Sequence, residues 1–164
     1  SAASDVYKRQ MPGMNMLVDI GNGTMSILEI HDGRPIENSI STEVFGVHQC
    51  MEKIQKEVSK HSGVDVSEML IEPLLRNGIG DRTDAVAMTT KRVAENYTVE
   101  IMKKLTAHGY REELVHLFII GGGGCLLKNF FDLTAKSEVT VITDICANAK
   151  GYEALAMMKQ RMRG

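Results

Sequence analysis

The fold of this chain is decided by residues 17–24, which read LVDIGNGT. An apolar run leads to Asp19, and two glycines separated by one asparagine follow it. Glycine lets backbone N–H groups approach an anion without a Cβ in the way, and a nearby carboxylate can hold a hydrated Mg²⁺ or orient a water. Asn22-Gly23 is also a favourable hairpin dipeptide. Taken alone, the stretch fits a phosphate-binding turn and a plain β-hairpin about equally well.

A second glycine turn lies about a hundred residues later, in residues 118–124, which read FIIGGGG. Each glycine costs roughly 0.5–1 kcal/mol relative to alanine in regular structure. A strand-to-helix turn needs one or two of them, so four indicate close approach of a flat or charged group, with a loose loop as the alternative. We expect a helix from about Leu126, whose N-terminal dipole favours an anion. The spacings GxGxxG and GxxxxGK[ST] are absent, which excludes the Rossmann and P-loop motifs.

The composition limits the class of protein. The chain has 164 residues, enough for one domain with a sizeable core, and its formal net charge is -2. This balance gives no field that favours nucleic acid or an anionic membrane, and no apolar run approaches the ~18 residues of a membrane span. The three cysteines form no CxxC motif, which is typical of a reducing compartment. We therefore expect a cytoplasmic protein with no membrane partner and no direct contact with nucleic acid.

Hydrophobic periodicity predicts three strands at the start of the fold, over residues 16–20, 25–30 and 34–40. The dipeptide Asp32-Gly33 predicts a tight hairpin between the second and the third. The three strands should therefore form an antiparallel meander. Residues 1–13 have no clear period and no turn chemistry. We expect them to be a non-native or disordered leader outside the fold.

Five helices and two more strands are expected after the meander. The first helix carries Val47, Cys50, Ile54 and Val58 on one face and ends near Gly63. The other predicted helices cover about residues 67–75, 84–106, 126–133 and 148–161, and the strands cover 115–120 and 139–142. Three strands followed by alternating helices and strands indicate an α/β fold, with a mixed sheet and helices on its faces.

Three motifs in this order resemble those of the actin superfamily of ATPases, which includes the heat-shock chaperone ATPase domain and the sugar kinases. Residues 18–24 are similar to its second phosphate motif, residues 118–124 to its adenosine motif, and residues 145–156 to the connecting helix. Within the superfamily the chain most resembles the ParM-type bacterial actins, which segregate plasmids. The resemblance implies an actin-like ATPase lobe, ribonuclease H-like in fold, over residues 14–164, with a small helical subdomain at about 60–85.

The resemblance also implies which residues would form a site for ATP or GTP with Mg²⁺. Asp19 matches a catalytic carboxylate that acts near the attacking water and, through water, near the metal. The residues that match nucleotide contacts are Gly21, Asn22, Gly23 and Thr24 for the β- and γ-phosphates, Gly121, Gly122 and Gly123 for the adenosine and α-phosphate, and Gly46 near the ribose. Glu72 and Arg76 are candidates for the purine pocket.

The function implied by the resemblance is that of an ATPase that self-associates into filaments and moves plasmid DNA apart through a DNA-binding adaptor protein. Two other functions stay open: the lobe of a small-molecule kinase acting on a sugar or an acid, and an interaction domain without activity. A complete actin fold has two lobes around the nucleotide, so we expect a fragment that lacks the first lobe. Such a fragment should bind ATP weakly and hydrolyse it poorly, because half of the preorganised phosphate contacts are missing.

Overall fold

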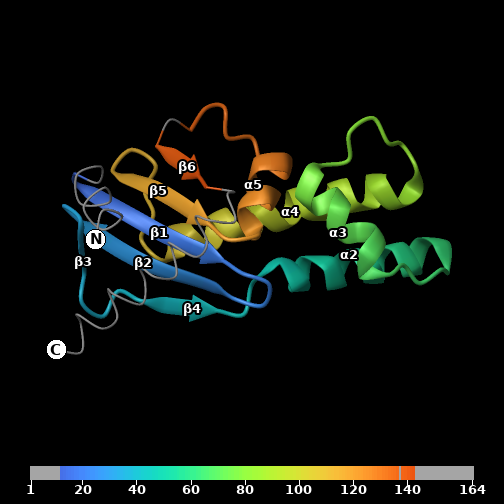
Figure 1. Ribbon diagram of the computed structural model, residues 1–164, viewed down its shortest axis with the longest axis horizontal. Helices are drawn as coiled ribbons and strands as arrows, with labels where there is room; N and C mark the ends of the chain where they lie inside the picture. Colours follow the sequence, from blue (N-terminus) through green and yellow to red (C-terminus); the bar gives the residue numbers. More distant parts are fainter. Residues whose placement is uncertain (1–11, 137, 143–164) are drawn as a thin grey trace.

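A computed structural model describes residues 12–136 and 138–142 of the chain. The sheet lies at one end of the molecule, and helices extend from it at the other end (Figure 1). The strands are β1 (Met14–Ile20), β2 (Met25–His31), β3 (Arg34–Pro35), β4 (Ser41–Glu43), β5 (Val115–Ile120) and β6 (Val139–Val141). The helices are α2 (Val47–Ser62), α3 (Glu68–Asn77), α4 (Ala85–Ala107) and α5 (Gly123–Phe130). This arrangement confirms the predicted α/β class.

The central strand of the sheet is β1. The strand order is β3-β2-β1-β5-β6, and β4 also pairs with β2. β1 is antiparallel to β2 and parallel to β5, so the sheet is mixed as predicted. Asp19 of β1 pairs with Ile120 of β5. Because parallel neighbours end at the same edge, the glycine turns that follow the two strands come to lie side by side.

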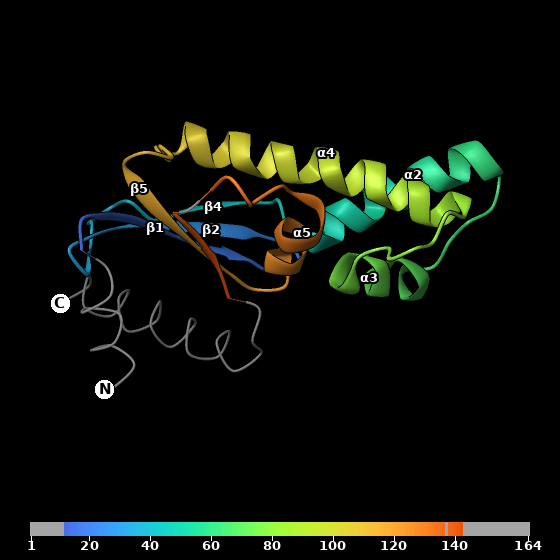
Figure 2. The ribbon, with the colours of Figure 1, turned by 90° about the horizontal axis from the view of Figure 1, so that it is seen from above.

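The sheet is apolar on both faces, and each face has its own core. Met16, Val18 and Ile20 of β1 belong to the large core, together with buried residues of α2, α4 and α5. Leu17 belongs to a smaller cluster on the other face, with Leu28 of β2. Figure 2 shows α4 running along one face of the sheet. Burial on both faces explains why β1 reads as a nearly continuous apolar run.

The two long helices have the predicted faces and ends. The face of α2 that carries Cys50 and Ile54 is buried, and the helix ends at Gly63, which has a φ of 67°. α4 begins after Asp84, whose side chain accepts the N–H of Ala87 at 3.1 Å. Among the helices described in residues 12–136 and 138–142, none combines the length and the apolar character needed to cross a membrane.

The predicted hairpin at Asp32-Gly33 is confirmed. His31 of β2 pairs with Arg34 of β3 across these two residues. Their φ angles are 46° for Asp32 and 74° for Gly33, and two successive positive φ angles are what a type I′ turn requires. The sequence signal and the backbone geometry therefore agree at this turn.

The predicted third strand over residues 34–40 is wrong in its extent. β3 ends at Pro35, and the chain pairs with β2 again only at β4. In the gap the Ser39 hydroxyl replaces a strand carbonyl by accepting the N–H of Glu29 at 3.1 Å, and Asn38 has a φ of 63°. A left-handed residue cannot continue a strand, so the edge breaks into two short segments.

The predicted helix over residues 126–133 is displaced in the structure, because α5 starts at Gly123 and ends at Phe130. Gly121 has a φ of 88°, and Gly122 already has the helical angles φ -62° and ψ -29°. Glycine is a poor helix former, so its propensity places the helix start too late. Close packing against Ile20 outweighs that propensity.

Several predictions on the chain ends and on subdomains fall outside the described residues. The terminal helix at 148–161, the connecting-helix motif at 145–156 and residues 1–11 of the leader lie outside them. Gly13, placed in the leader by the prediction, donates its N–H to Asp32 Oδ1 at 2.7 Å. α3 lies within residues 60–85, and the helical subdomain stays a prediction.

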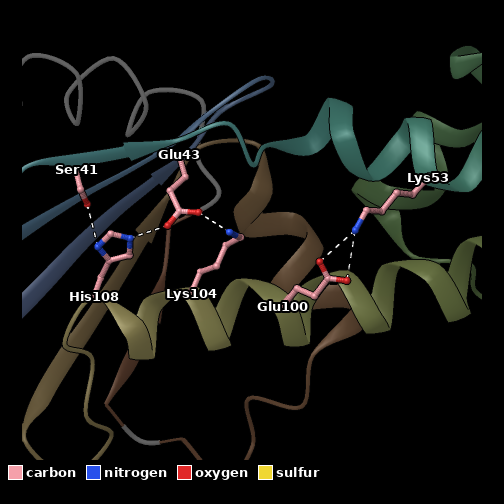
Figure 3. A network of polar contacts seen from close by, with 6 residues as sticks. All are labelled: Ser41, Glu43, Lys53, Glu100, Lys104 and His108. Atoms are coloured by element: carbon pink, nitrogen blue, oxygen red, sulfur yellow. Dashed lines mark hydrogen bonds and ion pairs between the residues drawn. The ribbon is translucent and has the colours of Figure 1, made fainter.

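β4 is held to the end of α4 by Ser41, Glu43, Lys104 and His108, here called the β4–α4 clamp (Figure 3). Lys104 Nζ donates to one Glu43 oxygen at 2.5 Å, and His108 Nε2 lies 2.7 Å from the other. His108 Nδ1 lies 3.3 Å from the Ser41 hydroxyl. Hydrogen bonds from Lys104 and then from His108 lower the pKa of Glu43. Because β4 leads into α2, the clamp sets the path of the chain toward that helix.

We expect the clamp to make the free energy of unfolding depend on pH. A carboxylate with a lowered folded-state pKa stabilises the fold above its unfolded pKa, here 4.5. That contribution is lost as the pH falls through the folded-state pKa. Glu43→Gln should therefore lose less stability than the unchanged protein on acidification from about pH 6 to about pH 3, measured by urea unfolding. Equal losses in the two proteins would show that the Glu43 carboxylate makes no pH-dependent contribution to stability.

Candidate functional site: two glycine turns and the pocket between them

The two glycine runs meet at one edge of the sheet. The first glycine turn, residues 21–24, connects β1 to β2, and the second, residues 121–124, follows β5. An ideal Cβ on Gly121 would lie 2.6 Å from Asp19 Oδ1 and 2.5 Å from the Ile20 carbonyl oxygen. Asp19 is only 6% exposed. The structure thus brings Asp19 and both turns together.

The first glycine turn is held from behind by the start of α2. The Gly21 carbonyl accepts the N–H of Val47 at 3.0 Å, and the Asn22 carbonyl accepts the N–H of His48 at 2.7 Å. The Gly23 carbonyl accepts the side-chain amide of Gln49 at 3.1 Å. Three successive carbonyls of the turn therefore point toward α2.

Because the carbonyls point toward α2, the backbone N–H groups of the turn face the side away from α2. No cis peptide bond occurs among the described residues, and in a trans peptide the C=O and the N–H point in opposite directions. The N–H groups of Asn22, Gly23 and Thr24 therefore point away from α2. Successive N–H groups that face one way form a concave site for an anion. The hairpin and phosphate-turn interpretations of residues 21–24 are thus compatible, because the turn that joins β1 to β2 also presents these N–H groups together. Phosphate binding by the turn stays a prediction.

Three of the glycines with predicted nucleotide contacts are required by packing. A Cβ on Gly46 would lie 2.5 Å from the Asn22 carbonyl oxygen, and one on Gly123 would lie 2.1 Å from Ile20 Cγ2. Gly121 has both a positive φ and backbone within 2.5 Å. These contacts account for the absence of a side chain without any ligand. The predicted nucleotide contacts of the three glycines stay predictions.

Two other glycines are not explained by packing. Among the described residues, no atom outside Gly23 and its two chain neighbours lies within 4 Å of the place that a Cβ would take on Gly23. A Cβ on Gly122 would lie at an ordinary 3.8 Å from Val47 Cγ2, the one contact that it would make with described residues other than its chain neighbours. The fold leaves space beside these residues, one in each turn. A ligand that occupies this space would lie close to the backbone and would itself require residues without a side chain.

A pocket of about 190 Å³ lies between the turns. It is lined by residues of both turns, α2, α3 and α5: Asn22, Val47, Met51, Glu72, Leu75, Arg76, Gly122, Cys125 and Leu126. Glu72 and Arg76, the two candidates for a purine pocket, therefore line the same cavity as the two turns, and they form an ion pair with each other. A mostly apolar lining with a few polar groups suits a flat heteroaromatic ring.

Two side chains, those of Asn129 and His48, contact the α3 wall of the pocket. Asn129 of α5 donates its side-chain amide to the Arg76 carbonyl at 2.9 Å and to the Leu75 carbonyl at 3.1 Å. His48 of α2 lies 3.3 Å from a carboxylate oxygen of Glu68. The sequence prediction included neither Asn129 nor Gln49. The spacing of Gln49 three residues after Gly46 is that of a capping box, which is the signal that could have identified it.

A metal site in the described residues would depend on Asp19. No group of three or more His, Cys, Asp or Glu side chains in residues 12–136 and 138–142 could hold a metal ion. A single carboxylate beside a phosphate-binding turn is nevertheless suited to Mg²⁺, which keeps several waters and takes oxygens from substrate phosphates. The site fits Mg²⁺ held through water, and it does not fit a metal held by protein ligands alone.

Residues 17–132 match a protein-family model described as "Archaeal actin homologue MreB-like, C-terminal". No curated protein matches the chain. Among solved structures, the archaeal actin homologue Ta0583 is 20% identical, with a TM-score of 0.69 over 96% of this chain and 53% of its own length. Another structure of Ta0583 is a complex with ADP.

Two ParM structures have the same fold. ParM from Bacillus thuringiensis with ATP is 14% identical, with a TM-score of 0.63, and the match covers 92% of this chain and 48% of that one. A 15-stranded ParM filament from Clostridium botulinum is 19% identical, with a TM-score of 0.64, and the match covers 88% and 46% of the two chains. The present chain thus spans about half the length of these proteins.

Proposed function

Because this chain belongs to the family of C-terminal domains of MreB-like archaeal actin homologues, we propose that it forms one side of the nucleotide site of a filament-forming ATPase. The observation that carries the proposal is the position of the pocket, which is lined by Asn22 of the first glycine turn and by Gly122 of the second. The N–H groups of the first turn are suited to phosphates, and the apolar pocket is suited to a purine.

The described residues suggest a placement for ATP or GTP. The β- and γ-phosphates would lie against the N–H groups of residues 22–24, and the purine would enter the pocket beside Glu72 and Arg76. Bound Mg²⁺ would neutralise charge that develops on the phosphates. Asp19 would orient the attacking water and contact the metal through water, because its carboxylate lies at the end of β1 where the turn begins.

At the level of the cell, we propose that the whole protein assembles into filaments in the cytoplasm and segregates plasmid DNA through a DNA-binding adaptor. A ParM relative forms filaments, and the net charge of -2 gives no reason for direct binding to DNA.

The test uses a protein that carries both lobes of the actin fold. ATP-dependent light scattering should rise as filaments form, and the same experiment with GTP compares the two nucleotides. No rise with either nucleotide, together with transfer of phosphate to a sugar, would overturn the filament proposal in favour of a small-molecule kinase.

Gly23→Ala separates the requirements of the fold from those of a ligand. The place of the new Cβ is empty and the φ of Gly23 lies outside the left-handed region, so the free energy of unfolding should change by less than about 1 kcal/mol. ATP affinity should fall about tenfold, because the methyl group crowds the N–H groups of the turn. Urea unfolding and an ATP titration of the 164-residue chain measure the two effects. Unchanged ATP affinity would remove phosphate binding from this turn.

A further inference from the structure

We propose that Gln49 is a positioning residue that sets the orientation of the first glycine turn toward phosphate. This inference rests on the proposed nucleotide-binding function and adds a residue to it. Gln49 lies in the first turn of α2 and is half-buried. It reaches back from the helix to the turn and links the two through its side chain.

The side-chain amide of Gln49 makes two different hydrogen bonds. Its Oε1 accepts the N–H of Gly46 at 2.8 Å, and its Nε2 donates to the Gly23 carbonyl at 3.1 Å. One bond requires an acceptor and the other a donor, so the orientation of the amide is determined. Glutamate could supply only the acceptor, and methionine could supply neither at normal strength.

The bond from Gln49 differs from the other two that hold the turn. Gly21 and Asn22 are held by backbone N–H groups of α2, which a substitution does not remove. The Gly23 carbonyl is held by the side chain of Gln49. Since this carbonyl belongs to the same peptide unit as the N–H of Thr24, Gln49 orients that N–H group.

The other end of the link, Gly46, is bonded to the core. The Gly46 carbonyl accepts the hydroxyl of Tyr97 from α4 at 2.7 Å, and the contact is buried. The Tyr97 ring stacks on Phe45 with 4.3 Å between the ring centroids. Gly46 is thus tied to the core on one side and to Gln49 on the other. Gln49 therefore connects the first glycine turn, through Gly46, to the core.

The test compares the affinity of the 164-residue chain for ATP with its affinity for adenosine, both measured by NMR titration. Adenosine reports on the purine pocket, and the ratio of the two dissociation constants reports on the phosphate contacts. Gln49→Met should reduce the preference for ATP about fivefold and leave adenosine affinity unchanged. Gln49→Glu, which keeps the bond from Gly46 but loses the bond to Gly23, should reduce it at least as much.

Gln55→Met is the matched control. Gln55 lies on the same helix and donates its side-chain amide to the Val66 carbonyl at 2.9 Å, so this variant also loses a bond from a glutamine to the backbone. It should keep the full preference for ATP. If both Gln49 variants also keep it, the inference is overturned while the proposed function stands. If the unchanged chain does not prefer ATP to adenosine, the proposed phosphate site itself fails.

Discussion

Gly121→Ala should lower the free energy of unfolding by about 3 kcal/mol, combining left-handed strain with overpacking. The φ of 88° is unfavourable for alanine, and the new Cβ would lie 2.5 Å from the Ile20 carbonyl oxygen. The Cβ would also press on Asp19 Oδ1, at 2.6 Å. ATP binding should therefore weaken as well, because the carboxylate and the end of β1 must move. Urea unfolding gives the first quantity and an ATP titration of the folded protein the second.

Gly122→Ala is the control for this prediction, since the two residues are adjacent. Gly122 has helical φ and ψ angles, and its Cβ would make only an ordinary contact with Val47. The free energy of unfolding of Gly122→Ala should stay within about 1 kcal/mol of that of the unchanged chain. Equal destabilisation at the two positions would mean that the second glycine turn does not pack on β1 in this way.

Asp19→Asn should reduce ATP hydrolysis by a factor of about 10² or more in a protein that carries both lobes, because a poorly oriented reactant costs about that much in rate. Asparagine has nearly the same shape but no negative charge. It would orient the attacking water less well and would interact more weakly with hydrated Mg²⁺. Steady-state phosphate release measures the loss, and ATP binding should change much less than turnover.

Asp81→Asn is the control, because Asp81 is an exposed carboxylate in the loop before α4. This variant should hydrolyse ATP at the unchanged rate. Thermal unfolding of Asp19→Asn identifies any loss of folded protein, which would lower ATP binding and turnover together. Full turnover by folded Asp19→Asn would remove Asp19 from its proposed role.

The features that the sequence predicted well are local or depend on a repeating pattern. The periodic apolar face of α2 and the Asp32-Gly33 turn were both predicted correctly. The sequence also indicated that the glycine runs after β1 and β5 belong together, because each follows a buried strand. The parallel pairing of the two strands, with Asp19 opposite Ile120, confirms this arrangement.

The features that the sequence did not predict depend on neighbours distant in the chain. No sequence signal near Gly123 indicates that Ile20 occupies the space of its missing side chain. The run of four glycines therefore suggested a ligand, although packing alone already requires glycine at positions 121 and 123. The break in the third strand depends on Ser39 bonding to Glu29 of β2. Local propensity contains no information on such contacts.

The pocket also depends on contacts between distant residues, which the sequence did not predict. Glu72 and Arg76 had the right chemistry for a purine site, but their sequence positions gave no reason to place them beside residues 22 and 122. The link from Asn129 to the end of α3 supplies that reason. The site is therefore built by contacts among α2, α3 and α5, none of which is local in the sequence.

The most direct test of the proposed nucleotide site is an NMR titration of the ¹⁵N-labelled 164-residue chain with Mg²⁺ and ATP. The largest shifts should occur at the amides of residues 22–24 and 121–123, with smaller shifts around Glu72 and Arg76. Adenosine alone should shift the pocket residues and leave residues 22–24 nearly unchanged. If ATP shifts neither glycine turn, or shifts only surfaces remote from both, the two turns are not a nucleotide site.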